Sequence, residues 1–231
     1  MSFDIYAGAF SRYYAREWEN VAQRHARETG MSYQMIRPND SGPADWDEVK
    51  QVVQHWRQGI KEGLGENAPS DLDWSEERDS PYFTDRPGWD GYSALVLLAA
   101  STETGQPLPS RLAEDALASD VVAAAMAIKQ KTHYRSIYQA QLWLPGSFDF
   151  SFSFVDLANE KIHIGNVRRL EHDLRHLQNA RQISDADLAE RVNGGIEDTS
   201  DTFAMGCFGL ALFLRIAVAA REHRLPIMLS Y

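Results

Sequence analysis

The longest apolar stretch of the chain, residues 203–220, is the feature that most constrains its fold. Arg215 is the one charged residue within it, and Gly206 and Gly209 lie near its start. A membrane-spanning helix needs about 20 predominantly apolar residues, whereas a shorter helix that is apolar on nearly every face is typical of a protein core. The sequence therefore predicts a buried, central helix over about Thr202–His223.

Hydrophobic periodicity predicts further helices and strands around this one. Helices are indicated where apolar side chains recur every three or four positions, at about residues 11–28, 46–64, 89–102 and 167–177. Strands are indicated by alternation or by short apolar runs, at about residues 3–7, 33–36, 148–155, 161–165 and 227–231.

A turn pair, Pro145 and Gly146, stands between an apolar run at 142–144 and the phenylalanine-rich segment 148–155. This arrangement predicts a hairpin whose phenylalanine face packs on helices. The whole pattern predicts an α+β fold with a helical majority packed around a small, mainly antiparallel sheet. Neither a repeat nor a clear boundary divides the chain, so we expect a single domain over residues 1–231.

Composition and charge exclude several classes of function. The chain has 33 acidic and 23 basic residues and a net charge of −10, which argues against binding to nucleic-acid phosphates. The single cysteine, Cys207, excludes an intrachain disulfide framework and a cysteine-rich zinc site. The first residues lack the basic start and apolar core of a secretory signal. We expect a cytoplasmic protein that binds neither nucleic acid nor membranes.

The histidines are the residues that could carry catalysis or bind a metal. His172 and His176 have the i, i+4 spacing of a metal-binding pair, but arginines surround them on the same helix, and we expect no metal there. His163 lies on a strand where it could meet Asp149, and a histidine oriented by a carboxylate is half of an acid–base pair. Motifs for a nucleophile, a phosphate loop or a dinucleotide are missing, so we assign no catalytic residue and expect no cofactor.

The acidic charge is concentrated in two segments. Residues 40–79 hold eleven acidic and four basic residues, and residues 185–201 hold six and one. The first segment leads into a long acidic loop at about 66–88, which has no sustained periodicity; a loop of that length is often functional. Exposed aromatic side chains within a charged rim are typical anchors of protein interfaces.

We therefore expect this loop to bind a basic protein partner. The residues expected to make the contact are Asp71, Asp73, Trp74, Glu76, Glu77, Asp79, Tyr82 and Phe83. The alternative is a solvated acidic loop whose Trp74 folds back onto the core.

Four short segments resemble a family of uncharacterised bacterial proteins that look like the immunity proteins encoded beside secreted polymorphic toxins. They are FDIYAG at 3–8, PYFTD at 81–85, WDGYSAL at 89–95 and LPIML at 225–229. None of them is a catalytic motif, so the resemblance transfers no functional residue.

The leading hypothesis is an acidic cytosolic inhibitor that blocks a toxin or another basic enzyme by direct contact. One alternative is a hydrolase or transferase that uses His163 with a nearby carboxylate. Another is a structural subunit of an oligomer, and the oligomeric state itself stays open.

Overall fold

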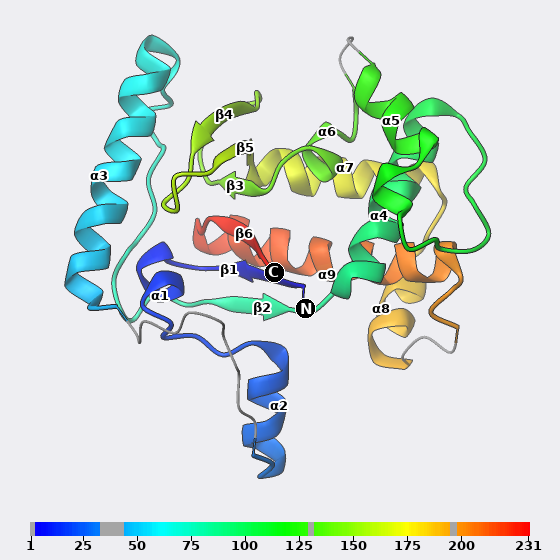
Figure 1. The fold of residues 1–231 in the computed structure, drawn as a ribbon, viewed down its shortest axis with the longest axis horizontal. Coiled ribbons are helices and arrows are strands. Elements are labelled where there is room, and N and C mark those ends of the chain that lie inside the picture. Colours follow the sequence, from blue (N-terminus) through cyan, green and yellow to red (C-terminus); the bar gives the residue numbers. More distant parts are fainter. Residues whose placement is uncertain (1–2, 33–43, 129–131, 195–197) are drawn as a thin grey trace.

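The computed structural model describes residues 3–32, 44–128, 132–194 and 198–231; the strand expected at 33–36 lies outside them. A sheet with the strand order β2-β1-β6-β3-β5-β4 runs through the described chain (Figure 1). Its strands are β1 (Asp4–Ala7), β2 (Phe83–Asp85), β3 (Leu142–Leu144), β4 (Phe152–Val155), β5 (Lys161–Asn166) and β6 (Ile227–Ser230). Only β3 and β5 pair in parallel, and the other neighbours are antiparallel. The predicted α+β fold with a mainly antiparallel sheet is confirmed.

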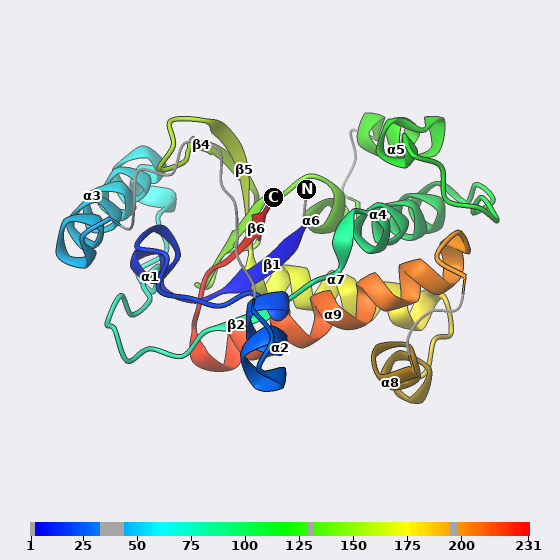
Figure 2. The same ribbon diagram turned by 60° about the horizontal axis from the view of Figure 1, so that its bottom comes forward.

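Helices cover both faces of this sheet. The α-helices are α1 (Phe10–Tyr14), α2 (Val21–Thr29), α3 (Trp46–Leu64), α4 (Gly88–Thr104), α5 (Asp120–Ala127), α6 (Arg135–Tyr138), α7 (Val167–Ala180), α8 (Asp185–Gly194) and α9 (Thr202–His223). Short 3₁₀ turns lie at Gly65–Asn67 and Ala116–Ala118. Figure 2 shows α7 and α9 beneath the sheet, with α1 and α3 beyond its other face.

Strand β1 explains how one chain forms two hydrophobic cores. Its neighbours β2 and β6 flank it, and all four of its residues are buried. Ile5 packs in the core built with α4, α7 and α9, whereas Tyr6 packs in the core built with α1 and α3. Successive side chains point to opposite faces of a strand, so the alternation in the sequence marks two apolar faces.

Helix α9 is the predicted central helix, with the predicted boundaries. The side chain of Asp201 accepts a hydrogen bond from the backbone N–H of Ala204 and caps the start of α9. By length and composition α9 could cross a membrane. However, 72% of its most apolar 18-residue stretch is buried inside the protein, as expected of a core helix. Arg215 projects to its exposed side and forms an ion pair with Asp85 on β2.

The helix expected over 11–28 is wrong, because the chain breaks between α1 and α2. Arg16 has a φ of 63°, a left-handed conformation that ends α1. The side chain of Asn20 then accepts a hydrogen bond from Gln23 N–H, and the Gln23 side chain accepts one from Asn20 N–H. This capping box begins a second helix. Trp18, in the break, stacks on Tyr13 with ring centroids 5.3 Å apart, so the apolar spacing persists without a continuous helix.

The hairpin expected at Pro145 and Gly146 is also wrong. Strand β5 lies between β3 and β4, so the hairpin is β4–β5, closed by a turn at Ala158 and Asn159, where Asn159 has a positive φ. The Asn166 side chain donates hydrogen bonds to the carbonyls of Leu144 and Gly146. These contacts hold the chain at the end of β3 and direct it away from β3, so β3 and β4 do not become neighbours.

Helices α4 and α9 approach each other closely where Gly209 on α9 meets Gly91 on α4. A Cβ atom on Gly209 would lie 2.2 Å from the carbonyl oxygen of Gly91, whereas a Cβ on Gly91 would meet its nearest atoms at 3.4 Å. Glycine within a helix normally lowers stability by about 0.5–1 kcal/mol relative to alanine. Position 209 has room only for glycine, because the two backbones touch there.

We predict that Gly209→Ala lowers the free energy of unfolding by about 1–3 kcal/mol, because overpacking forces α4 and α9 apart. Gly91→Ala serves as the matched control and should change stability by less than about 1 kcal/mol. Urea denaturation of both variants measures the difference. Equal midpoints for the two variants would contradict this packing of α4 against α9.

Candidate functional site

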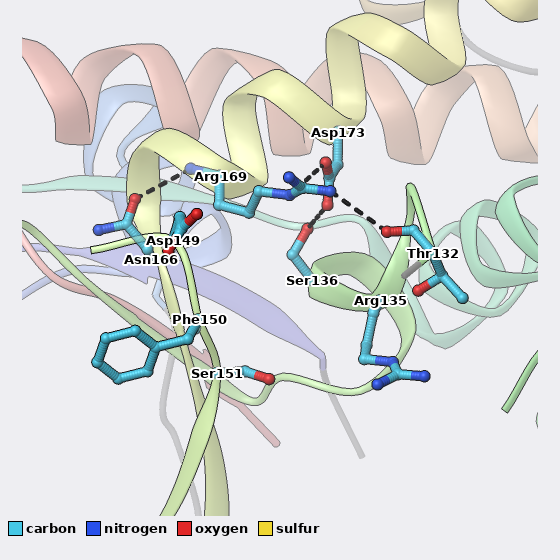
Figure 3. Close-up of a pocket in the computed structure, with 10 residues that line it drawn as sticks. Thr132, Arg135, Ser136, Asp149, Phe150, Ser151, Asn166, Arg169 and Asp173 are labelled. Atoms are coloured by element: carbon cyan, nitrogen blue, oxygen red, sulfur yellow. Dashed lines mark hydrogen bonds and ion pairs between the residues drawn. The ribbon is translucent and has the colours of Figure 1, made fainter. Parts of the chain in front are cut away.

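A polar pocket of about 220 Å³ opens where β5 runs into α7 (Figure 3). Its walls come from the start of α6, the segment before β4, the end of β5 and the first turns of α7. The lining residues are Thr132, Arg135, Ser136, Asp149, Phe150, Ser151, Gly165, Asn166, Arg169 and Asp173. We call it the α7 pocket.

A buried carboxylate, Asp173, organises one wall of the α7 pocket. It is 1% exposed. Its Oδ1 lies 2.8 Å from Arg169 Nε, and its Oδ2 accepts a hydrogen bond of 2.5 Å from the Ser136 hydroxyl. Burial raises the pKa of Asp173, and the hydrogen bond from Ser136 and the charge of Arg169 oppose that shift. The ionised carboxylate therefore depends on these partners to remain charged in the folded protein.

Asn166 positions the helix that carries these residues. Its side-chain oxygen accepts a hydrogen bond of 3.0 Å from Arg169 N–H, which caps α7. Its side-chain NH₂ donates to the Gly146 carbonyl at 2.8 Å, which ties the cap to the end of β3. A single residue thus joins the sheet to the first turn of α7 and sets the direction of Arg169.

The polar wall does not present a paired nucleophile and base. The Ser136 hydroxyl donates to Asp173, and the His172 ring lies 3.2 Å from the other oxygen of that carboxylate. A hydrolytic triad needs the histidine to contact the hydroxyl, and here the carboxylate stands between them. Burial also raises the pKa of the Cys207 thiol to about 11, which keeps it neutral. The arrangement is suited to holding a ligand by hydrogen bonds and charge.

His163 does not meet Asp149, the carboxylate that the sequence analysis considered as its partner. Its cross-strand partner is Ser153, whose hydroxyl lies 3.1 Å from the His163 ring nitrogen Nδ1. Asp149 precedes β4 and lines the α7 pocket, whereas His163 is not among the residues that line it. The acid–base pair of His163 with Asp149 is therefore not formed.

His172 and His176 share one face of α7, with ring centroids 6.4 Å apart. His176 also stacks on His133 at 4.5 Å, and its Nδ1 lies 2.8 Å from the Tyr134 hydroxyl. Burial raises the pKa of Tyr134 to about 12, so this hydroxyl keeps its proton at neutral pH. Within the described residues no group of three or more metal-binding side chains is present.

The acidic loop is fixed to the domain by Glu76, which is 4% exposed. Its carboxylate accepts hydrogen bonds from the backbone N–H groups of Phe10 and Ser11, at 3.2 and 2.7 Å. These N–H groups begin α1 and have no partner within the helix. The Trp74 indole N–H also donates to Glu76. Glu76 is thus a structural residue, and its carboxylate is not available to a partner.

The Trp74 side chain is only 5% exposed. It folds back onto the core, as the alternative hypothesis for this residue predicted. Its ring packs against Phe10 at 5.6 Å, and the Arg57 guanidinium lies 4.0 Å above it. The exposed aromatic anchor expected at this position is wrong. The reason is that Arg57 on α3 and Phe10 on α1 form a slot that the indole fills.

The remaining loop residues differ in their exposure. Asp73 and Glu77 form ion pairs with Arg57 and Lys50 of α3, but 67% and 66% of their side chains remain exposed. Asp79 is exposed, and Asp71, which is partly buried, accepts hydrogen bonds from Ser147 that lower its pKa.

The two aromatic residues that follow are only partly exposed. Tyr82 lies under the Arg12 guanidinium at 4.9 Å, and Phe83 packs beside His223 at 5.2 Å. Both rings are therefore held by contacts within the domain.

Exposed carboxylates of the loop pair with Lys50 and Arg57 of α3, and the N-cap and first turn of α3 add three more carboxylates. Asp45 caps α3, and Asp47 and Glu48 follow it, all exposed. The ion pair of Lys50 with Glu77, and Arg78 stacked 4.9 Å above the Trp46 ring, hold the two segments together. We call the exposed carboxylates of Asp45, Asp47, Glu48, Asp73, Glu77 and Asp79 the acidic face.

Comparison with known protein families, with curated proteins and with solved structures finds no match to this chain. The immunity-like resemblance therefore stays a prediction.

The residues of the α7 pocket were not identified from the sequence as a site. Asp149 was considered only as a partner of His163. Arg169 was only one of the arginines on the helix that carries His172 and His176. The one available signal was Asn166 before the amphipathic pattern of α7, which is typical of a helix cap. The pocket itself depends on the parallel pairing of β3 with β5, and sequence periodicity does not reveal that pairing.

We predict that Glu76→Ala lowers the free energy of unfolding by about 2–4 kcal/mol, because it leaves buried N–H donors without an acceptor. Glu77→Ala is the matched control, since its exposed ion pair should contribute less than about 1 kcal/mol. Urea denaturation distinguishes them. If both substitutions cost the same, Glu76 is not the acceptor that fixes the loop.

We also predict that Asp173 and Arg169 are energetically coupled. Removing Arg169 leaves the buried carboxylate of Asp173 without its ion pair, and removing Asp173 leaves the partly buried Arg169 and the Ser136 hydroxyl without their acceptor. Asp173→Ala alone should therefore cost about 3–5 kcal/mol. A double-mutant cycle with Arg169→Ala, followed by chemical denaturation, should give a coupling energy of about 1–3 kcal/mol. Additive losses would show that the pair contributes nothing beyond its separate side chains.

Proposed function

We propose that the protein is an acidic, cytoplasmic binding protein of the immunity type, which inhibits a basic protein partner by direct contact. The partner would be a toxin or another basic enzyme. The observation that carries this proposal is the acidic face, where carboxylates from the loop and from the first turn of α3 are gathered on one side of the domain.

The charge of the acidic face supports a role in binding. Exposed carboxylates of one sign raise the association rate of a partner of opposite charge. Lys50, Arg57 and Arg78 offset part of this charge, but the surrounding carboxylates outnumber them. The loop that carries part of the face is attached to the helices beneath it. Glu76 accepts a hydrogen bond from α1, and Trp74 packs under Arg57 of α3.

The structure changes which residues we assign to the interface. Trp74 and Glu76 support the face from within, and Asp73, Glu77 and Asp79 remain as contact residues. The carboxylates of α3 were not part of the expected interface and now join it. The resemblance to immunity-like proteins agrees with this role.

We predict that Glu48→Gln, Glu77→Gln and Asp79→Asn together slow association with the partner at least threefold at low salt. The physical reason is lost electrostatic attraction, which is screened over about 10 Å at 0.1 M ionic strength, so the difference should shrink as salt is added. The partner is best sought in the product of the adjacent gene, and surface plasmon resonance measures the rates.

A matched control removes the same charge from the opposite end of the domain, by Glu114→Gln, Asp115→Asn and Glu190→Gln. This variant should associate at nearly the parental rate. Equal rates for the two triple variants would contradict the assignment of the acidic face. If only the control variant were slower, the interface would lie at the end of the domain that carries Glu114, Asp115 and Glu190.

A further inference from the structure

We propose that the α7 pocket binds a small zwitterionic amino acid, with the ligand's ammonium group beside Asp149 and its carboxylate beside Arg135. This activity is separate from contact with a protein partner, because the α7 pocket and the acidic face are built from different elements.

The first step is to separate the charges that the fold uses from those that it leaves available. Four charged residues line the pocket, two of each sign. Arg169 and Asp173 neutralise each other at 2.8 Å, and Arg169 also donates to the Thr132 carbonyl at 3.3 Å. This pair is part of the pocket wall and has little capacity left for a ligand.

The second pair, Asp149 and Arg135, is arranged differently. Figure 3 shows the two side chains on opposite sides of the pocket. Arg135 donates one hydrogen bond, to the Ile128 carbonyl at 2.6 Å, out of the five that a guanidinium can donate. Among the described residues neither side chain has an ion-pair partner. The pocket therefore has one charge of each sign without an ion-pair partner on opposite sides of its opening. Asp149 is exposed on one side, and the Arg135 guanidinium lies at the other edge and points away from Asp149.

The balance of charge defines the class of ligand. A simple anion would match Arg135 but meet Asp149, and a simple cation would match Asp149 but meet Arg135. A molecule with an ammonium and a carboxylate satisfies both walls at once and leaves the total charge of the pocket unchanged. Charge-assisted hydrogen bonds of this kind are the strong ones.

The size and remaining surface of the pocket fit a small molecule. Its volume of about 220 Å³ lies below the roughly 300–1,000 Å³ of pockets for drug-sized ligands. The Phe150 ring is 37% exposed and is held in place by Phe148 and Phe152, at centroid distances of 5.3 and 6.1 Å. The ring follows Asp149 in the chain and points away from Ser136 and Asp173, so it offers an apolar surface at the outer edge of the pocket on the Asp149 side.

The test is calorimetric titration and thermal denaturation of the full chain with each of the twenty common L-amino acids at up to 10 mM. At least one should bind and raise the melting temperature with concentration, because a ligand of the folded state stabilises it. For the amino acid that binds, the matching amine without the carboxylate and the matching acid without the amine should each bind at least tenfold more weakly.

Variants separate the proposed site from binding elsewhere. Asp149→Asn and Arg135→Gln should each weaken binding at least tenfold, while their melting temperatures without ligand stay close to that of the parent. The matched controls, Asp120→Asn on α5 and Arg168→Gln on the outer side of α7, should bind like the parent. The proposal is overturned if no amino acid binds at 10 mM, or if binding survives both pocket substitutions.

Discussion

The buried carboxylate of Glu76 is the interaction on which the arrangement of the second core depends. It receives the first N–H groups of α1 and the indole of Trp74, so it joins the acidic loop to a helix more than sixty residues earlier in the chain. Arg57 of α3 lies 3.6 Å from the same carboxylate. Three segments thus meet at one carboxylate. The free-energy cost of removing this charge from water is offset by the hydrogen bonds and the ion pair that it receives.

The helices and the fold class could be predicted from the sequence, because each depends on local spacing. The apolar pattern predicted the boundaries of α9 and the range of α3. The break between α1 and α2 could not be predicted in this way, since Trp18 keeps the apolar spacing while the backbone leaves the helix. Strand β2 was missed because three residues carry too little periodicity, and the order of β3, β5 and β4 depends on contacts between distant segments.

The candidate sites also divide into features that depend on local sequence and features that depend on contacts between distant segments. The acidic charge could be read from composition, and its concentration on one side of the domain agrees with the local excess in residues 40–79. The sequence could not show which acidic side chains are buried, because Glu76 and Glu77 are neighbours with the same chemistry. Their roles differ only because alternate residues of the loop face α1 or solvent. The α7 pocket could not be predicted for a related reason. Its charged residues come from separate segments of the chain that meet only in the fold.

The central claim is that the acidic loop is a fixed part of the domain whose interior residues support an exterior acidic face. Hydrogen exchange of the Trp74 indole N–H, assigned by nuclear magnetic resonance with a Trp74→Phe variant, tests it most directly and requires no partner. The account predicts exchange at least a hundredfold slower than that of a free indole, because this N–H is buried and donates to Glu76. Exchange at the free rate would show that the loop is open to solvent and would contradict the account.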